Sequence, residues 1–189
     1  MNGRQFFEKY SKLIDFIVKL QIRIPRKIRM MEFNRIRNRN GRVSMLRRYI
    51  LLRTLAESVG KNVSVFPGVY FEHIENLRIG DNVSIHPMCY IDGEGGITIG
   101  DDVSIAHRTT ILSSNHKYSD DSMSIKYQGM ILDETIIHDN VWIGCSCTIL
   151  AGSVINSGCV VGANSTVTGV INANSVAVGS PVREIKQRI

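Results

Sequence analysis

A six-residue repeat limits how this chain can fold more than any other feature of its sequence. Written in sixes, IGDNVS at Ile79, IGDDVS at Ile99 and IHDNVW at Ile137 each open a run in which Ile or Val returns at the first position. A period of six is typical of a β-solenoid, because a short strand and a corner together use six residues and three sixes close one coil. The first-position side chains are predicted to point inward and stack between coils. They are Ile79, Ile85, Ile91, Ile99, Ile105, Ile111, Ile137, Ile143, Ile149, Ile155, Val161 and Val167.

The fifth position of each six holds a small or β-branched residue, and three of the four cysteines fall there. Cys89, Cys147 and Cys159 occupy this column, where only small groups fit beside a corner. Cys145 stands in the third column and is expected to face outward or line a corner. Because the chain has no Cys-x-x-Cys pair, the cysteines are interpreted as packing residues, and no metal site is predicted.

Two segments break the repeat. The first, DGEGG at residues 92–96, shifts its phase by two residues. The second begins after His116, where the repeat stops until Ile137. Residues 117–136 are therefore predicted to leave the solenoid as one loop. A loop of this length inside a compact repeat is usually functional, which directs attention to His116 at its start.

The region before the repeat is basic and predicted to be helical. Residues 1–53 contain 15 Lys and Arg against 3 Asp and Glu, whereas the rest of the chain is mildly acidic. Residues 1–62 are interpreted as a cap, because the open end of a solenoid exposes core and strand edges. Apolar residues recur here at steps of three and four, as on one face of a helix. They are Phe6, Tyr10, Leu13, Ile17 and Leu20.

The same basic region also suggests contact with an anionic membrane surface. No apolar run is long enough to span a membrane, and the early apolar stretch lacks a signal-peptide cleavage site. The protein is therefore expected to be cytoplasmic, within reach of the inner face of the membrane. No nucleic-acid-binding module is recognised. The residues assigned to membrane contact are Arg23, Arg26, Lys27, Arg29, Arg35, Arg37, Arg39 and Arg42.

The repeat and its loop resemble the hexapeptide-repeat acyltransferases over residues 63–189. The segments that carry the resemblance are IGDDVSIAHRTTILSSNH, IIHDNVWIGCSCTILAGSVI, VVGANSTVTG and VAVGSPVREIK. Within that family the sequence is most similar to the maltose and galactoside O-acetyltransferases and related polysaccharide-biosynthesis enzymes. The resemblance implies an all-β solenoid, with a left-handed parallel β-helix over residues 63–182, an N-terminal α-helical cap and a basic tail at residues 183–189.

The resemblance also implies transfer of an acetyl group from acetyl-CoA, with His116 as the general base. An imidazole titrates near neutrality and can remove the proton of a hydroxyl as that hydroxyl attacks the thioester. Neither a metal nor a covalent enzyme intermediate is implied. The positions that contact acetyl-CoA in the family correspond here to Trp142, Cys145, Ala163, Thr168, Arg183 and Lys186.

The acceptor side departs from the family pattern. The sugar acetyltransferases often carry Ala-Pro-Asn ahead of the base, whereas this chain has Ala-His-Arg at residues 106–108. Arg108 suits an anionic acceptor such as a phosphate or a uronate, because a guanidinium binds such groups in a bidentate manner. The candidate acceptor contacts are His107, Arg108, Asn115 and Asp120.

These observations predict an O-acetyltransferase that modifies a sugar hydroxyl in the biosynthesis of a surface polysaccharide such as a capsule, O-antigen or exopolysaccharide. Its acceptor is a small sugar or a lipid-linked sugar, and it is expected to be a homotrimer with active sites between neighbouring prisms. An N-acetyltransferase of a nucleotide-linked amino sugar is the alternative. A zinc enzyme like the γ-class carbonic anhydrases is disfavoured because no His-x-x-x-x-His spacing occurs. A non-catalytic scaffold is the remaining interpretation.

Overall fold

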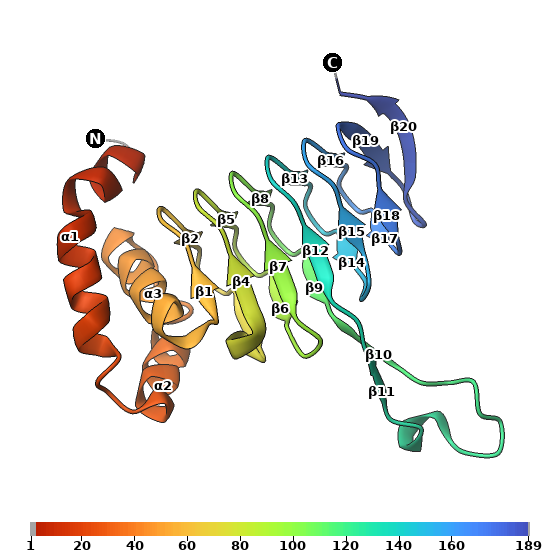
Figure 1. Cartoon of the computed structure of the whole chain (residues 1–189), viewed down its shortest axis with the longest axis horizontal. Coiled ribbons are helices and arrows are strands. Elements are labelled where there is room, and N and C mark those ends of the chain that lie inside the picture. Colours follow the sequence, from red (N-terminus) through yellow and green to blue (C-terminus); the bar gives the residue numbers. More distant parts are fainter. Residues whose placement is uncertain (1–2, 189) are drawn as a thin grey trace.

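The chain folds into a long three-sided prism with helices at one end and a hairpin that leaves one edge (Figure 1). The computed structural model describes residues 3–188. Short strands follow the sides of triangular coils, and each coil pairs with the next through parallel strands. The prism is a left-handed β-helix, which confirms the predicted fold class.

Three sheets form the sides of the prism, and each coil passes through sheets A, B and C in turn. Sheet A contains β1 (Ser58–Val59), β4 (Leu77–Ile79), β7 (Ile97–Ile99), β12 (Thr135–Ile137), β15 (Val154–Ile155) and β18 (Val170–Ile171). Sheet B contains β2 (Ser64–Val65), β5 (Ser84–Ile85), β8 (Ser104–Ile105), β13 (Trp142–Ile143), β16 (Val160–Val161), β19 (Ser175–Val178) and the antiparallel β20 (Arg183–Gln187). Sheet C contains β3 (Tyr70–Glu72), β6 (Tyr90–Asp92), β9 (Thr110–Leu112), β14 (Thr148–Ile149) and β17 (Thr166–Val167).

One inward side chain from each strand builds the core of the prism. In sheet B, Ile85 pairs with Ile105 and Ile105 pairs with Ile143, so the three side chains form one column. Equivalent columns run through sheets A and C. All twelve predicted first-position residues are at most 4% exposed, which confirms the predicted inward register. The fifth-position cysteines Cys89 and Cys147 are also buried.

The number of residues per coil varies, and the extra residues lie at the edge between sheets C and A. Ile137 pairs with Ile155, eighteen residues later, as three sixes require. Ile79 pairs with Ile99, twenty residues later. The 92–96 break supplies the two additional residues at the C–A edge between them. The phase shift in the sequence is therefore a local enlargement of this edge.

Contact between coils explains the Ile-Gly-Asp motif. The carboxylate of Asp101 accepts the backbone N–H of Asp81 in the preceding coil at 2.6 Å, and that of Asp139 accepts the N–H of Asp101 at 2.8 Å. Each carboxylate lies where a Cβ on the preceding coil's glycine would be, at Gly80 and Gly100. Glycine is needed at this second position because the next coil approaches closely, and not because of an unusual φ.

At most corners the fourth residue of the six-residue unit has a left-handed backbone. Asn82 and Asp102 hold it at the A–B edge with φ of 58° and 57°, and short polar side chains tolerate this conformation well. At the B–C edge Met88 and Arg108 hold the same conformation with φ of 62° and 61°. Long side chains rarely do so, so Met88 and Arg108 both stand where glycine or a short polar residue would fit the backbone better.

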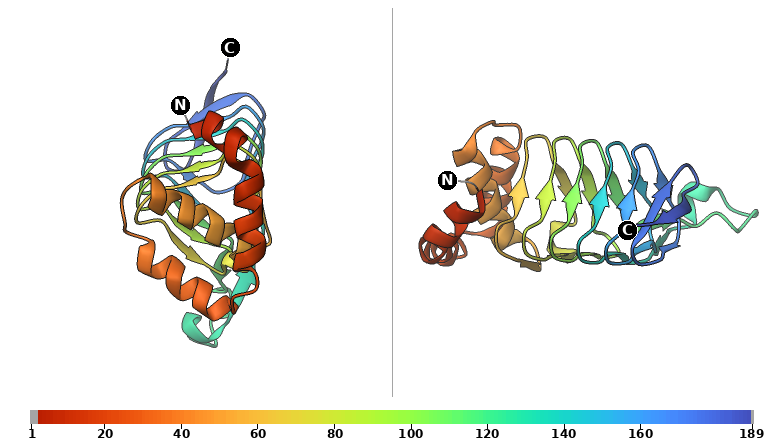
Figure 2. Two further views of the ribbon diagram at one scale, coloured as in Figure 1. Left: turned by 90° about the vertical axis from the view of Figure 1, so that its left-hand side faces the viewer. Right: turned by 90° about the horizontal axis from the view of Figure 1, so that it is seen from above.

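Three helices cover the first coil of the prism. α3 (Arg42–Leu55) lies against β1 and β2, and both α2 (Arg26–Ile36) and α1 (Gly3–Gln21) pack on α3. The end-on view in Figure 2 places α1 in front of the coils, so it is the outermost layer at this end. None of the described helices combines the length and the apolar character needed to cross a membrane.

The buried Arg48 fixes the helices to the prism. Arg48 is 1% exposed, and its guanidinium donates to the carbonyl oxygens of Val65 in β2 at 2.9 Å, Ile36 at 3.1 Å and Arg39 at 2.7 Å. Burial lowers the pKa of Arg48. A buried charge is stable only where its donors are satisfied, so this side chain holds α3, the end of α2 and the first coil in one arrangement.

The buried face of α1 differs from the predicted apolar face. Ile14 and Val18 are buried against α3, whereas Leu13 and Leu20 are 54% and 45% exposed. The side chain of Phe6 lies outside the described residues. The predicted apolar face is thus divided between the core and the surface, because α1 is apolar around more of its circumference than it buries.

Two ends of the prism differ from the predicted boundaries. β1 already pairs with β4, so the coils begin at Ser58 and not at residue 63. At the other end β20 pairs with β19, so the residues predicted as a tail form the last strand of sheet B.

Replacing Gly100 by Ala is expected to lower the free energy of unfolding by about 1–3 kcal/mol, because the added Cβ overlaps the backbone nitrogen of Asp139. Thermal unfolding followed by circular dichroism measures the change. Gly169→Ala is the matched control, since a Cβ added at Gly169 would meet no heavy atom within 4 Å. Equal melting temperatures for the two variants would contradict the close approach of coils at the second position.

Candidate functional site

His116 lies on a hairpin that leaves the C–A edge of the prism. β10 (Ser114–His116) and β11 (Met130–Leu132) pair in antiparallel fashion, and His116 faces Met130 in the register. Thr135 already pairs with Ile97 in sheet A, so the segment outside the prism spans residues 114–134. The predicted loop, residues 117–136, differs from this by three residues at its start and two at its end.

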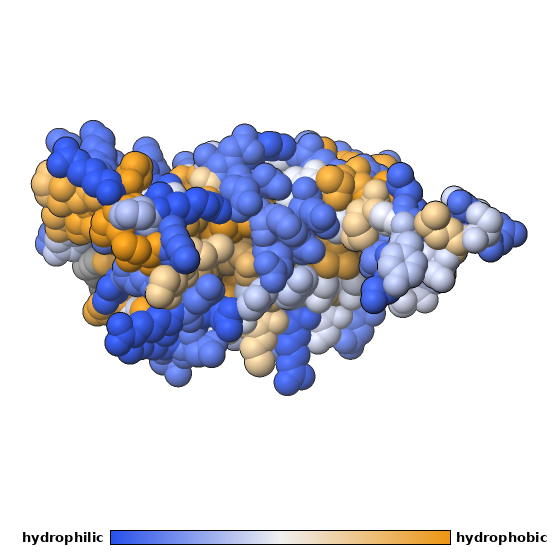
Figure 3. All heavy atoms as spheres, turned by 90° about the horizontal axis from the view of Figure 1, so that it is seen from below, coloured by the Kyte–Doolittle hydropathy of each residue, from blue (hydrophilic) through white to orange (hydrophobic). Residues whose placement is uncertain are grey.

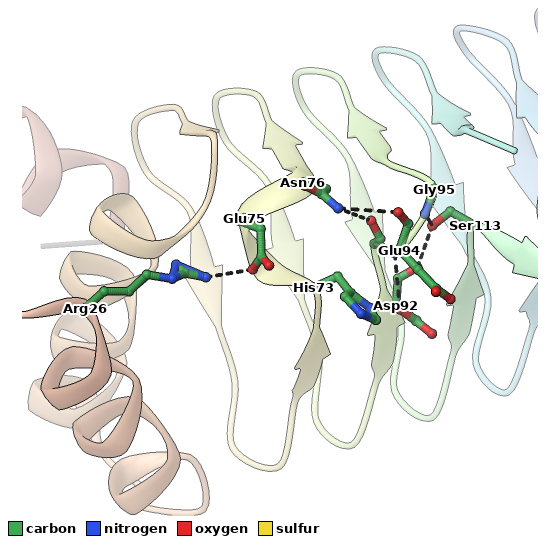
Figure 4. Close-up of polar contacts among 9 residues, drawn as sticks. Arg26, His73, Glu75, Asn76, Asp92, Glu94, Gly95 and Ser113 are labelled. Atoms are coloured by element: carbon green, nitrogen blue, oxygen red, sulfur yellow. Dashed lines mark hydrogen bonds and ion pairs between the residues drawn. The ribbon is translucent and has the colours of Figure 1, made fainter. Parts of the chain in front are cut away.

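The root of the hairpin is tied to the enlarged edge of the preceding coil. The Ser113 hydroxyl accepts the backbone N–H of Gly95 at 2.9 Å and donates to the carbonyl oxygen of Asp92 at 2.8 Å (Figure 4). The Thr135 hydroxyl donates to the carbonyl oxygen of Leu112 at 2.7 Å. These buried contacts fix the direction in which the hairpin leaves the prism, and with it the position of the His116 backbone.

The hairpin carries several exposed apolar side chains. His116 is exposed, and so are its neighbours Asn115 and Lys117, whereas Met130, which faces it in the register, is half-buried. A two-stranded hairpin has little stability of its own in water. Exposed apolar side chains grouped on one segment make it a candidate interaction surface. The exposed apolar residues of the hairpin are Tyr118, Met123, Ile125, Tyr127, Ile131 and Leu132.

Two of the candidate acceptor contacts lie on this hairpin. Asn115 is exposed on β10 beside His116. Asp120 shapes the loop, since its carboxylate accepts the hydroxyl of Ser122 at 2.6 Å and the N–H of Ser122 at 2.9 Å. The Ser122 hydroxyl bond is the main cause of a lowered pKa at Asp120. Gln128 donates to the Asp120 carbonyl at 2.6 Å. The structure therefore gives Asp120 a local role in ordering the loop.

The other acceptor candidates lie at a different edge. His107 and Arg108 are exposed at the corner between sheets B and C. The backbone of the next coil continues this corner, because Ser146 donates its N–H to the His107 carbonyl at 3.0 Å. His86 lies one coil earlier at the same edge, stacked on Phe66, and burial lowers its pKa.

The acetyl-CoA candidates are distributed over sheet B and both of these edges. Cys145 and Ala163 follow His107 along the B–C edge, and Thr168 lies at the C–A edge two coils beyond the hairpin. Trp142 is 55% exposed on the outer side of sheet B. Arg183 and Lys186 are on β20, the last strand of sheet B. Sheet C separates the two edges, so one prism by itself does not gather all these residues at one point.

A polar cluster at the C–A edge was not identified from the sequence. His73 Nδ1 lies 2.9 Å from Asp92 Oδ1, and Glu94 lies beside them on the same edge (Figure 4). His73 has a left-handed backbone with φ of 46° and precedes the 3-10 turn η1 (Ile74–Asn76). The hydrogen bond to Asp92 is the main cause of a raised pKa at His73. The signal in the sequence that could have found it was the lengthening of the coils at this edge.

The same three side chains are the one group among residues 3–188 with a spacing that a metal ion can bridge. Their ligand atoms lie within 4.8 Å of one another, but His73 is exposed and its nitrogen is already hydrogen-bonded to Asp92. A cavity of about 390 Å³ lies elsewhere, between α1, α3 and the first coils. Its lining includes Asp15, Tyr49 and Arg53, and none of the candidate site residues.

Comparison with known proteins decides the family. The profile described as bacterial transferase hexapeptide (six repeats) matches residues 134–169. Over 142 residues the chain is 33% identical to galactoside O-acetyltransferase of Escherichia coli K12, and the alignment covers 75% of this chain and 68% of that protein. The chain belongs to the hexapeptide-repeat acetyltransferases. The family resemblance inferred from the sequence is confirmed.

Other curated members of the family align over shorter stretches. The chain is 38% identical over 89 residues to WbbJ of Escherichia coli K12, a putative lipopolysaccharide biosynthesis O-acetyl transferase, covering 43% of this chain and 45% of WbbJ. It is 37% identical over 78 residues to the probable acetyltransferase Rv3034c of Mycobacterium tuberculosis, covering 41% of this chain and 26% of that protein. The chain thus aligns with less than half the length of these two relatives.

Solved structures of hexapeptide-repeat acetyltransferases share the fold. Galactoside acetyltransferase in complex with coenzyme A aligns with a TM-score of 0.77 and 32% identity, over 89% of this chain and 82% of that one. VCA0836 of Vibrio cholerae, complexed with acetyl coenzyme A, aligns with a TM-score of 0.75 and 27% identity, over 86% of this chain and 88% of that one. A point mutant of AntD, an N-acyltransferase from Bacillus cereus in complex with dTDP and coenzyme A, aligns with a TM-score of 0.63 and 28% identity, over 70% of this chain and 73% of that one.

His73→Gln is expected to lower the melting temperature by about 1–3 °C at pH 5.5, because an exposed ion pair contributes about 0.2–1 kcal/mol. The pKa of His73 is raised in the folded protein, so the pair stabilises fully below the unfolded pKa and loses this effect as pH rises through the folded pKa. The difference between variant and wild type should therefore shrink by pH 9. His138→Gln is an exposed control. A difference that grows with pH would contradict the assigned pair.

Proposed function

We propose that this protein is an acetyl-CoA-dependent O-acetyltransferase that modifies a sugar hydroxyl during biosynthesis of a surface polysaccharide. The observation that carries the proposal is the position of His116, on a hairpin rooted in the prism edge of a hexapeptide-repeat acetyltransferase. The similarity to WbbJ supports the polysaccharide context. That alignment covers less than half of either chain, so the acceptor itself is left to experiment.

His116 acts as the general base in this proposal. Its imidazole takes the proton from the acceptor hydroxyl as the oxygen attacks the thioester carbonyl carbon. The C–O bond forms, a tetrahedral oxyanion is stabilised by backbone N–H groups, and collapse breaks the C–S bond. The imidazolium then returns the proton to the coenzyme A thiolate. The exposed setting of His116 in a single chain becomes a closed site once a neighbouring surface covers the hairpin.

Acetyl-CoA is proposed to lie along the prism between sheet B and its edges. Cys145 and Ala163 hold the same position in successive coils and together offer a continuous edge for the pantetheine arm. The Cys145 carbonyl accepts the N–H of Asn164 at 2.9 Å, which holds these two coils together. Trp142 offers an exposed aromatic surface. Arg183 and Lys186 are exposed cations and are proposed to bind the phosphates. Thr168 lies at the C–A edge, beyond sheet C, and would contact the same acetyl-CoA only from a neighbouring prism.

A homotrimer with active sites between prisms is proposed as the working form. His116 lies at the C–A edge and Arg108 at the B–C edge, with sheet C between them. A small acceptor contacts both if one residue comes from each of two neighbouring prisms. The exposed apolar side chains of the hairpin support this arrangement, because a second prism would bury them.

An N-acetyltransferase of a nucleotide-linked amino sugar is the second candidate. The similarity to AntD, an N-acyltransferase solved with dTDP, favours keeping it. Release of coenzyme A from acetyl-CoA, measured against matched hydroxyl and amino sugars, sugar nucleotides and lipid-linked oligosaccharides, distinguishes the two. Turnover confined to amino sugars would replace O-acetylation by N-acetylation without changing the role of His116.

His116→Ala is expected to lower the rate of coenzyme A release by about 10²–10⁴, because a positioned general base contributes that much. Coenzyme A binding, followed by calorimetry, should stay unchanged. The matched control is His138→Ala, since His138 is exposed at the A–B edge away from the hairpin. Wild-type turnover in the His116 variant would remove it from the mechanism.

Arg108→Gly is expected to raise the KM for an anionic acceptor by about 10–100-fold, since a hydrogen bond to a charged group contributes about 1.5–3 kcal/mol. Glycine is the cleanest deletion because it retains the left-handed backbone at this corner. Met88→Gly has the same backbone setting one coil earlier and serves as the control. An unchanged KM for acidic acceptors together with a weaker coenzyme A affinity would reassign Arg108 to the cofactor.

A further inference from the structure

The outer face of α1 carries an apolar stripe that the protein fold leaves uncovered. Leu13, Phe16 and Leu20 follow the i, i+3, i+7 pattern and so lie on one side of the helix. Their exposures are 54%, 58% and 45%. Ile14 and Val18 on the opposite side are buried against α3. The stripe therefore takes no part in the packing of α1 against the rest of the protein.

The stripe lies at the free end of the molecule. α1 packs on α3, which in turn packs on the first coil, so the outer side of α1 faces away from the prism (Figure 2). In Figure 3 apolar surface is concentrated over the N-terminal helices, with hydrophilic side chains around it. Prisms that associate side by side leave their ends open, so the proposed trimer does not cover this face.

Cations border the stripe. Lys9, Lys12 and Lys19 are exposed on α1, and Arg23 follows just beyond its end. Asp15 of the same helix pairs with Arg53 of α3 at 2.6 Å, so its negative charge is matched within the protein. The exposed face thus combines apolar side chains with a net positive charge.

The basic residues assigned to membrane contact from the sequence are partly engaged within the protein. Arg29 is buried and donates to the Ile24 carbonyl oxygen at 2.9 Å. Arg26 pairs with Glu75 at 2.6 Å, and Arg37 lies over the ring of Tyr70 at 4.5 Å. Part of the charge of the N-terminal region is therefore engaged within the protein. The exposed cations of α1 lie beside its apolar stripe, and α2 also exposes Ile28 and Met31 near Lys27 and Arg35.

We infer that the outer face of α1 binds the surface of an anionic lipid bilayer, with Leu13, Phe16 and Leu20 inserted at the level of the headgroups and the lysines on lipid phosphates. An amphipathic helix with this composition lies in the plane of the interface. A lipid surface fits better than a second copy of the chain, because two such faces in contact would place lysines against lysines. The inference does not depend on acetyl transfer, although it would bring a lipid-linked acceptor close to the enzyme.

Vesicle flotation tests this with the whole chain. Binding is expected to vesicles of phosphatidylcholine mixed with phosphatidylglycerol, to be much weaker to pure phosphatidylcholine, and to fall as salt is raised. Phe16→Gln should weaken binding by about tenfold, because it removes the largest inserted side chain. Replacing Lys9, Lys12 and Lys19 by Gln should weaken it by about fivefold per lysine.

Val170→Gln is the matched control, since Val170 is 66% exposed on sheet A, away from α1. It should bind vesicles as the wild type does. Melting temperature and coenzyme A release with a soluble acceptor should be unchanged in all variants, which separates this test from that of the acetyltransferase proposal. Equal binding to neutral and anionic vesicles, or equal effects of Phe16→Gln and Val170→Gln, would overturn the inference. A change in oligomeric state on light scattering in Phe16→Gln, without a change in vesicle binding, would make the stripe a contact between copies instead.

Discussion

The stacking of one inward side chain on its equivalent in the next coil is the interaction on which the whole structure depends. Ile85, Ile105 and Ile143 form such a column, and truncating a buried isoleucine costs about 2–5 kcal/mol. Because each column fixes the register of the parallel strands, it also fixes where every corner falls. Residues far apart in the sequence therefore meet along an edge whenever they hold the same position in their sixes. Most of the candidate site residues lie on those edges.

The candidate functional features lie where the repeat is interrupted or where a corner holds an unfavoured side chain. The C–A edge gains two residues in the first coils, which creates the corner occupied by His73 and Asp92, and one coil later it releases the hairpin with His116. Ser113 connects the two features through paired hydrogen bonds. At the B–C edge Arg108 keeps a left-handed backbone that glycine would adopt more easily. A regular coil needs neither the enlarged edge, nor the hairpin, nor a long side chain at a left-handed corner for its stability, so these are the natural places to look for function.

The N-terminal helices cover the open end of the prism. An open coil leaves inward side chains and strand edges in contact with water, and α3 covers them, with Arg48 bonded to backbone carbonyls of the helices and of β2. This arrangement uses one side of α1 for packing and leaves the other side apolar and exposed. A cap that only closed the solenoid would carry a polar outer face. The composition of α1 is the physical reason for assigning it a second role.

The sequence by itself determined the prism, because each six-residue unit carries its own structural signals. They are the inward first position, the small fifth position and the glycine before aspartate, and each is set by its neighbours one coil away. The burial of all twelve first-position residues follows from that period, and the break after residue 116 marked the hairpin. Tertiary structure alone decided which residues meet at an edge, because coil length varies along the prism. The extra residues of the early coils bring Asp92 beside His73, while Arg108 lies on the far side of sheet C. Tertiary structure also decided which side of α1 is buried. Because α1 is apolar on much of its surface, its helical period allows more than one apolar stripe to face the core. Packing against α3 selects one of them.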